Sequence, residues 1–168
     1  MRSPVMVVMG SRSDWEIMQE TVAELRRLGV PCEAHVASAH RTPERTVELV
    51  RQGEREGVRV FVCGAGMAAH LAGVVAAHTV RPVIGVPLPG GVADGLDALL
   101  ATVQMPGGVP VATVAVGKAG ARNAAVLAAQ ILALGDPELA DRLAAQRQRA
   151  AAAVGEADRD LQELVAQP

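Results

Sequence analysis

Short valine-rich runs alternate with segments of helical periodicity along most of this chain, and this alternation restricts the folds it can adopt. Five apolar runs have the length and composition of strands and cover residues 5–9, 32–36, 58–63, 82–86 and 111–116. Apolar runs without polar alternation are typical of parallel strands that are covered on both faces. The runs therefore predict one parallel sheet between two layers of helices.

Helical patterns fill the gaps between these runs. Residues 14–28 carry apolar side chains at helical spacing and end before Gly29, a common stop signal. Thr42 and Pro43 form a capping residue and a first-turn proline, which open a helix to about residue 56. Further helices are expected at 68–78, 95–103 and 121–134. The fold expected is a three-layer α/β/α, flavodoxin-like or Rossmann-like parallel sheet.

The chain of 168 residues is long enough for one domain with a substantial core. We assign residues 1–135 to an α/β catalytic domain and residues 136–168 to a C-terminal helical extension. From residue 138 onward, Ala, Arg, Gln and Glu dominate, which predicts one or two polar helices. The extension is either solvated or packed on a neighbouring subunit.

Composition argues against several classes of partner. The net charge is −2, with Trp15 and Phe61 as the only aromatic residues, so a nucleic-acid partner is not expected. Cys32 and Cys63 lack a CxxC spacing and are expected to be buried free thiols in a reducing compartment. Neither a signal peptide nor an apolar stretch of membrane-spanning length is recognisable. A soluble, cytoplasmic protein without a membrane partner is expected.

Polar or glycine-rich loops follow the first three predicted strands. They cover residues 10–14, 38–41 and 64–66. Ligands of an open α/β sheet bind outside the carboxyl ends of the strands. We therefore expect the three loops to share one site.

The first loop has the features of an anion site. Ser11 and Ser13 supply hydroxyl donors, and the backbone N–H groups of a helix start lie next to them. Asp14 is either an ordinary helix N-cap or an acceptor for a sugar hydroxyl. The Walker and GxGxxG patterns are both missing, so neither ATP nor a dinucleotide is expected.

The second loop carries the candidate acid/base. His40 lies in a turn rather than on a periodic apolar face, where it could transfer protons near neutral pH or be merely a capping or exposed histidine. Its neighbour Arg41 can clamp a phosphate. His35 and His78 are expected to be structural or exposed, whereas His70 could line the pocket. The histidines and cysteines lack metal-ligand spacing, and no metal is expected.

Six ordered motifs between about residues 5 and 134 resemble those of the N5-carboxyaminoimidazole ribonucleotide mutases of purine biosynthesis. The first three are Met9-Gly10-Ser11-x-Ser13-Asp14-Trp15, Ser38-Ala39-His40-Arg41-Thr42-Pro43 and Gly64-Ala65-Gly66-x-Ala68-Ala69-His70-Leu71. The others begin at Pro82, Val103 and Gly117. Met67 stands where the family commonly has glycine, Ala72 where it usually has proline, and residues 88–91 replace a more polar stretch.

This resemblance implies an isomerase that moves a carboxyl group on a ribonucleotide without ATP, biotin, metal or another cofactor. It implies a homo-octamer, in which the extension is expected to pack on a neighbouring subunit. His40 would be the general acid/base, and CO2 would be released transiently and recaptured. The expected substrate-binding residues are Ser11, Ser13, Asp14, Ser38, Ala39, Arg41, Gly64, Ala65, Gly66, Ala68, Ala69, His70 and Leu71.

Other functions remain open from the sequence. The nearest is a direct aminoimidazole ribonucleotide carboxylase, against which Arg41 and the sequence Ala68-Ala69-His70 argue. A diverged paralogue, such as a carboxylase of a pyridinium nucleotide, is a second alternative. A non-catalytic flavodoxin-like binding or signalling module is a third, although the chain lacks flavin-flanking aromatic rings and an aspartate after the third strand.

Overall fold

Five parallel strands form one sheet in the computed structural model, which describes residues 3–166. The strands are β1 (Val5–Met9), β2 (Cys32–Val36), β3 (Val60–Ala65), β4 (Val83–Pro87) and β5 (Ala112–Thr113). Their order is β2-β1-β3-β4-β5, which is the flavodoxin-like order. Met9 at the end of β1 is in register with both Val36 of β2 and Gly64 of β3, so the three following loops start at one level. The predicted fold class is confirmed.

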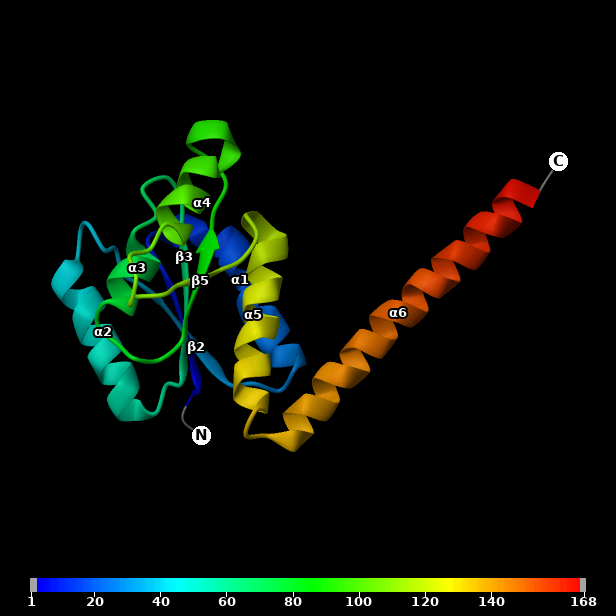
Figure 1. The fold of residues 1–168 in the computed structure, drawn as a ribbon, viewed down its shortest axis with the longest axis horizontal. Coiled ribbons are helices and arrows are strands. Elements are labelled where there is room, and N and C mark those ends of the chain that lie inside the picture. Colours follow the sequence, from blue (N-terminus) through cyan, green and yellow to red (C-terminus); the bar gives the residue numbers. More distant parts are fainter. Residues whose placement is uncertain (1–2, 167–168) are drawn as a thin grey trace.

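Helices cover both faces of this sheet (Figure 1). The helices α1 (Trp15–Arg27) and α5 (Gly117–Ala133) pack together on one face. The other face carries α2 (Pro43–Glu56), α3 (Leu71–Ala76) and α4 (Leu96–Val103). Two short 3-10 turns, η1 (Arg12–Asp14) and η2 (Val92–Asp94), precede α1 and α4. Because all five strands are parallel, their carboxyl ends lie at one edge of the sheet, which is where open α/β sheets bind ligands.

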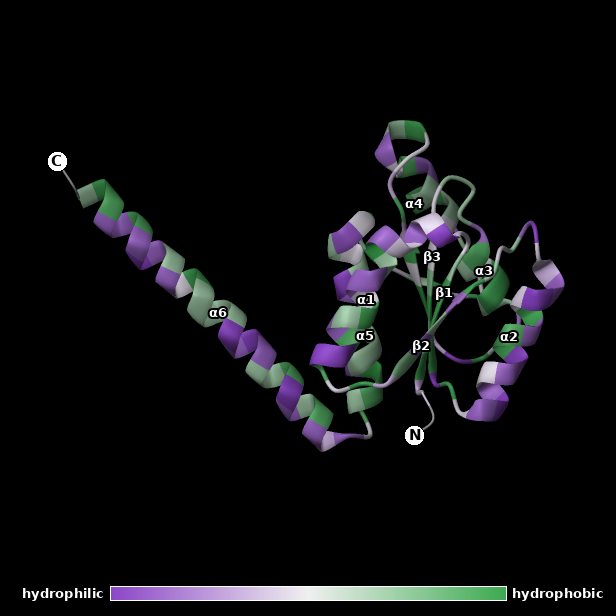
Figure 2. Ribbon diagram, turned by 180° about the vertical axis from the view of Figure 1, so that it is seen from behind, coloured by the Kyte–Doolittle hydropathy of each residue, from purple (hydrophilic) through white to green (hydrophobic). Residues whose placement is uncertain are grey.

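The core lies on both sides of the sheet, and β1 shows why its sequence is apolar without alternation. Val5, Val7 and Met9 pack into the cluster under α1 and α5. Met6 and Val8 point the other way, into the cluster that contains Phe61. All five residues of β1 are buried, and the strands form a hydrophobic centre between more polar helices (Figure 2). A parallel sheet covered on both faces requires this pattern.

Several predicted boundaries were wrong. Strand β3 spans Val60–Ala65 in place of 58–63, and β4 is shifted by one residue. The last strand has two residues in place of six, because β5 is an edge strand that follows Pro110 and pairs only with β4. Helix α5 begins at Gly117, not at residue 121. A Cβ at position 120 would overlap the Ala115 carbonyl, so close packing requires glycine there. Glycine disfavours helix, which is why the sequence did not indicate this first turn. The predicted helix 68–78 is reduced to Leu71–Ala76, because tight turns occupy the residues before Leu71.

The C-terminal extension is a single helix, α6 (Pro137–Ala166), that projects away from the sheet (Figure 1). Leu139 is buried beside α5, and Nε of Arg142 donates to the Leu28 carbonyl at 2.9 Å. Beyond this base the helix is exposed, including Val154, Leu161, Leu164 and Val165. Neither α6 nor any other helix within residues 3–166 combines the length and the apolar character needed to cross a membrane.

Candidate active site

The three predicted loops meet at one cleft of about 540 Å³ at the carboxyl ends of β1 and β3. In the observed strand order, the winding of the chain reverses between these two strands, which is where open α/β sheets bind ligands. The backbone N–H of Gly10 donates to the Gly64 carbonyl at 3.3 Å, so the first and third loops are joined directly. The fold therefore explains why residues so far apart in sequence share one cleft.

The first loop is held by a capping box around the turn η1. The Ser11 N–H donates to Oδ2 of Asp14 at 2.9 Å, and the Ser13 N–H donates to Oγ of Ser11 at 3.3 Å. The Ser13 hydroxyl also donates to Oγ of Ser11, at 2.9 Å. Asp14 thus turns its carboxylate back to the loop, and its side chain makes no cap hydrogen bond to α1. Ser11 is the N-cap of η1 and Asp14 is its third residue, so the Asp14 side chain does not act as an ordinary helix N-cap in either element.

Burial makes the Asp14 carboxyl harder to ionise. Partial burial raises the pKa of its carboxyl above the ordinary value of 3.8. The backbone N–H groups of Ser11 and Gly10, and the nearby positive charge of Arg41, lower the pKa but do not outweigh burial. Such a partly desolvated carboxylate interacts strongly with a hydroxyl or cationic group that enters the cleft.

Arg41 connects the second loop to the first. Its Nη2 donates to the Gly10 carbonyl at 2.7 Å, and its Nε donates to Oγ of Ser38 at 3.4 Å. The same Ser38 hydroxyl accepts from the backbone N–H of Arg41 at 3.2 Å. The guanidinium is exposed, and its other N–H groups are available to an anion. Arg41 is therefore pre-positioned at the edge of the cleft by two neutral acceptors.

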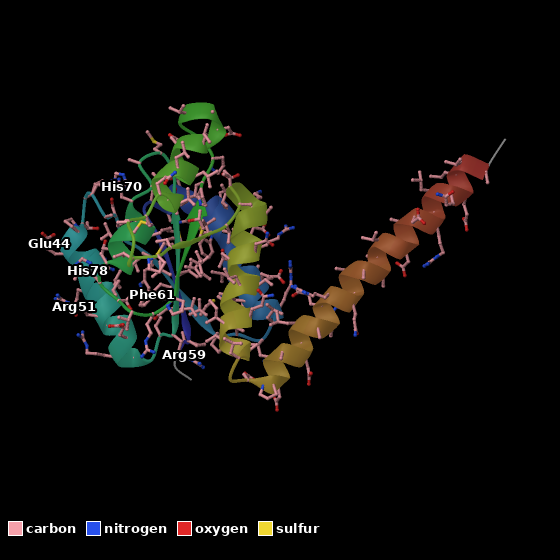
Figure 3. All side chains as sticks on the ribbon, viewed as in Figure 1. Glu44, Arg51, Arg59, Phe61, His70 and His78 are labelled. Atoms are coloured by element: carbon pink, nitrogen blue, oxygen red, sulfur yellow. The ribbon has the colours of Figure 1, made fainter. Side chains whose placement is uncertain are left out.

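His40 has one direct partner in the third loop. Its Nε2 lies 2.8 Å from Nδ1 of His70, and the two rings cross at 83° with centroids 5.0 Å apart. One of these nitrogens donates an N–H and the other accepts it. His40 lines the cleft, whereas His70 lines a separate cleft between α3 and α4. Figure 3 shows His70 and His78 on the side of the molecule that carries α2 and α3. His70 therefore contacts His40 from outside the cleft.

The third loop delays the start of α3. Met67 has a φ of 55°, in the left-handed region that costs a side-chain-bearing residue about 1–2 kcal/mol. Two tight turns follow. The Ala69 N–H donates to the Met67 carbonyl at 2.9 Å, and the His70 N–H donates to the Ala68 carbonyl at 2.8 Å. Helical periodicity cannot detect these backbone conformations, which is why the helix was predicted three residues too early.

Most of the predicted site residues line the cleft. These are Ser11, Ser13, Asp14, Ser38, Ala39, His40, Arg41, Ala65, Gly66, Ala68 and Leu71. Three others do not. Gly64 is buried in β3 under the Met18 side chain, Ala69 is buried beneath the loop, and His70 faces the neighbouring cleft.

The expected substrate-binding residues left out a fourth wall, residues 88–91, although the sequence had singled out both this loop and Met67 as able to change the pocket. Gly10, Met67, Leu88, Pro89, Gly90 and Gly91 also line the cleft. Residues 88–91 follow β4, and the Leu88 N–H donates to the Ala65 carbonyl at 2.9 Å. The rule that ligands bind at the carboxyl ends of strands applies to β4 as well, so the pair Gly90-Gly91 was the available signal.

Other reactive side chains lie outside the cleft. Nδ1 of His78 donates to the Val74 carbonyl at 3.0 Å, and Nε2 of His35 lies 3.5 Å from a Glu33 carboxylate oxygen. Cys63 is fully buried, which raises the pKa of its thiol to about 12. Within residues 3–166, no group of three or more His, Cys, Asp or Glu side chains is arranged to hold a metal ion.

Comparison with known proteins agrees with this architecture along the whole α/β unit. A family model described as AIR carboxylase (AIRC) matches residues 4–153. The N5-carboxyaminoimidazole ribonucleotide mutase of Saccharolobus solfataricus is 54% identical over 139 residues, which cover 83% of this chain and 87% of that protein. The mutase of Mycobacterium tuberculosis H37Rv is 50% identical over 163 residues, covering 97% of this chain and 92% of that protein.

A solved structure shares both the fold and a substantial part of the sequence. The crystal structure of Treponema denticola PurE superimposes with a TM-score of 0.86 at 30% identity, and the match covers 94% of this chain and 97% of that chain. The similarity thus includes the three loops that form the cleft and most of α6. The chain belongs to the AIR carboxylase family.

Proposed function

We propose that this chain is an ATP-independent isomerase that converts N5-carboxyaminoimidazole ribonucleotide into 4-carboxyaminoimidazole ribonucleotide in purine biosynthesis. One observation carries the proposal: a histidine pair places His40 in a cleft between an anion-binding loop and a glycine-rich apolar loop. This arrangement suits a substrate that has a phosphate at one end and exchanges a proton and CO2 at the other. The names of the relatives support the same reaction.

The polar end of the cleft would hold the phosphate and ribose. Arg41 offers free guanidinium N–H groups, and the hydroxyls of Ser11 and Ser13 lie beside it. Asp14 would accept from a ribose hydroxyl, for which a partly desolvated carboxylate is well suited. Ser38 and Ala39 would border the sugar from the second loop.

His40 would transfer one proton in each direction. In its protonated form it gives a proton to the exocyclic nitrogen while the C–N bond of the carbamate breaks, which yields CO2 and aminoimidazole ribonucleotide. The ring carbon then attacks CO2, a C–C bond forms, and neutral His40 removes the proton from that carbon. The second step regenerates the protonated histidine. The proton that His40 gives in the first step returns to it in the second, and the CO2 that is released is added back. The two steps together therefore only move the carboxyl group, with no net input from ATP or a cofactor.

His70 would act through His40. Its hydrogen bond restrains the His40 ring, and a neutral His70 can accept an N–H from the protonated form. Charge-assisted hydrogen bonds of this kind are stronger than neutral ones. His70 is therefore proposed as a positioning residue, in place of the substrate contact that the sequence suggested.

The apolar end of the cleft would hold CO2 between the two steps. Ala65, Gly66, Ala68 and Leu71 line this end and offer no charged side chain. Gly64 and Ala69 support it from below. Keeping CO2 near the ring carbon replaces an encounter in solution with an intramolecular step.

We also propose that the protein is a cytoplasmic homo-octamer in which α6 packs on a neighbouring subunit. The exposed side chains of Val154, Leu161 and Leu164 would be buried by that contact. The free thiols of Cys32 and Cys63 suit a reducing compartment. Truncation after residue 150 is expected to lower the number of subunits per particle measured by light scattering, and an unchanged number of subunits would exclude residues 151–168 from the assembly contact.

The decisive assay offers the purified protein two substrates separately. Turnover of N5-carboxyaminoimidazole ribonucleotide, with none of aminoimidazole ribonucleotide plus bicarbonate at equal enzyme concentration, is expected. Turnover of only the second would make the protein a direct carboxylase, and turnover of neither would leave a paralogue or a binding module. Direct carboxylation, a pyridinium nucleotide and a binding module gain no support from the names of the relatives.

A further inference from the structure

Met67 differs from the other large apolar side chains that line the cleft. Leu71 and Leu88 are 2% and 3% exposed and are fixed in the core, whereas Met67 is 66% exposed. Pro89 is also exposed, but its ring is tied to the backbone. A methionine side chain has several rotatable bonds and adapts to irregular surfaces. Of these four large apolar side chains, Met67 is therefore the one that can move over a bound ligand.

Folding of the subunit does not explain a methionine at this position. Its φ of 55° suits glycine, and its side chain is too exposed for packing to offset the backbone strain. Gly66, Ala68 and Ala69 on either side are all small. A strained backbone that presents a long side chain to a cleft suggests a function in the cleft.

The geometry of the fourth wall leaves room for this movement. A Cβ at Gly66 would lie 3.6 Å from the Leu88 carbonyl oxygen, so the third and fourth loops are in close contact there. A Cβ at Gly90 would meet nothing within 4 Å. The third and fourth loops thus leave no more than a side chain's contact distance between them at Gly66, whereas Gly90 borders open space, and Met67 lines the same cleft.

We propose that Met67 closes the apolar end of the cleft over the bound ribonucleotide and retains CO2 between its release and recapture. This inference rests on the proposed function. The thioether side chain would cover the ring, exclude water and lengthen the stay of an uncharged gas that no polar group binds. Met67 would then determine how much CO2 returns to the substrate, without taking part in either proton transfer.

The test measures retention of the migrating carboxyl group. Substrate with an isotope-labelled carboxyl carbon is converted in unlabelled bicarbonate with carbonic anhydrase, and mass spectrometry gives the label in the product and the fraction lost as aminoimidazole ribonucleotide. Met67→Ala and Met67→Gly are expected to lose several-fold more CO2 per turnover than wild type. Met67→Leu, which keeps the apolar bulk, is expected to retain it nearly as wild type does.

Two comparisons separate the possible causes. Met67→Ala keeps a Cβ on the strained backbone and Met67→Gly does not, so a loss shared by both is due to the side chain. Val80→Ala truncates a side chain that is 97% exposed and lines a different cleft, and it should change nothing. Equal label retention in wild type, Met67→Ala and Met67→Gly would refute the role of Met67. Leakage from Met67→Leu equal to that from Met67→Ala would also refute it. If wild type itself converts no substrate, the proposed function fails instead.

Discussion

Replacing His70 by phenylalanine tests whether the second histidine acts through the first. The substitution keeps a ring of similar size but removes the nitrogen that lies 2.8 Å from Nε2 of His40. His70 does not line the substrate cleft, so binding should be little affected. The expected result is a lower kcat at a nearly unchanged KM.

The magnitude follows from the strength of the lost hydrogen bond. A hydrogen bond to a charged group contributes about 1.5–3 kcal/mol, and His40 is charged when it delivers its proton. Each 1.36 kcal/mol of barrier is worth about a factor of ten in rate. His70→Phe should therefore lower kcat by about 10- to 100-fold, and initial rates over a range of substrate concentrations measure it.

His70→Asn is the matched control. An asparagine amide places a polar atom near the position of Nδ1, so it should restore most of the lost kcat. A merely structural role for His70 would make the two variants differ in thermal stability and not specifically in kcat. An unchanged kcat in His70→Phe, or a rise in KM that accounts for the whole loss, would refute the reasoning.

Three further predictions concern binding and titration. Arg41→Ala removes a charged anion donor and should raise KM by about 10- to 100-fold with a smaller effect on kcat, and an unchanged KM would exclude a phosphate clamp. Because burial raises the pKa of Asp14 in the folded state, its ionisation opposes folding as pH rises through that pKa. Asp14→Asn keeps an acceptor for the Ser11 N–H. The unfolding free energy of this variant in urea, relative to that of wild type, should therefore rise from about pH 4 to about pH 7, and its KM should be higher. Burial raises the pKa of the Cys63 thiol to about 12 and, less strongly, that of Cys32, so native labelling at about pH 8 should modify Cys32 first. Modification of Cys63 before unfolding would contradict its burial.

The sheet and its helices were predictable because burial on both faces leaves a strong mark on the sequence. The apolar run at residues 5–9 predicted both ends of β1 correctly, and the run at residues 32–36 did the same for β2. β5 was overestimated because an edge strand is limited by its single neighbour, which an apolar run does not reveal. The polar composition after residue 137 predicted one or two helices, and the structure has a single continuous helix, α6. Composition indicates helix but not whether the helix is interrupted.

The site was predictable in position more than in detail. The rule for the carboxyl ends of parallel strands brought His40, Arg41 and Asp14 together correctly. It could not reveal the contact of His40 with His70, which depends on consecutive tight turns after Met67. Methionine itself gives no signal for the left-handed backbone of Met67, and the glycine that the family commonly has at this position was the one indication of it. These unpredicted features depend on tertiary packing and underlie the proposed roles of His70 and Met67.

The acid/base role of His40 is tested most directly by His40→Asn with N5-carboxyaminoimidazole ribonucleotide as substrate. Turnover and nucleotide affinity are measured on the same preparation, so that loss of folding cannot be mistaken for loss of chemistry. The variant should fold and bind the nucleotide with near-normal affinity, while its kcat falls to the background rate. Near-normal turnover in His40→Asn would contradict the assignment of the proton transfers to this side chain.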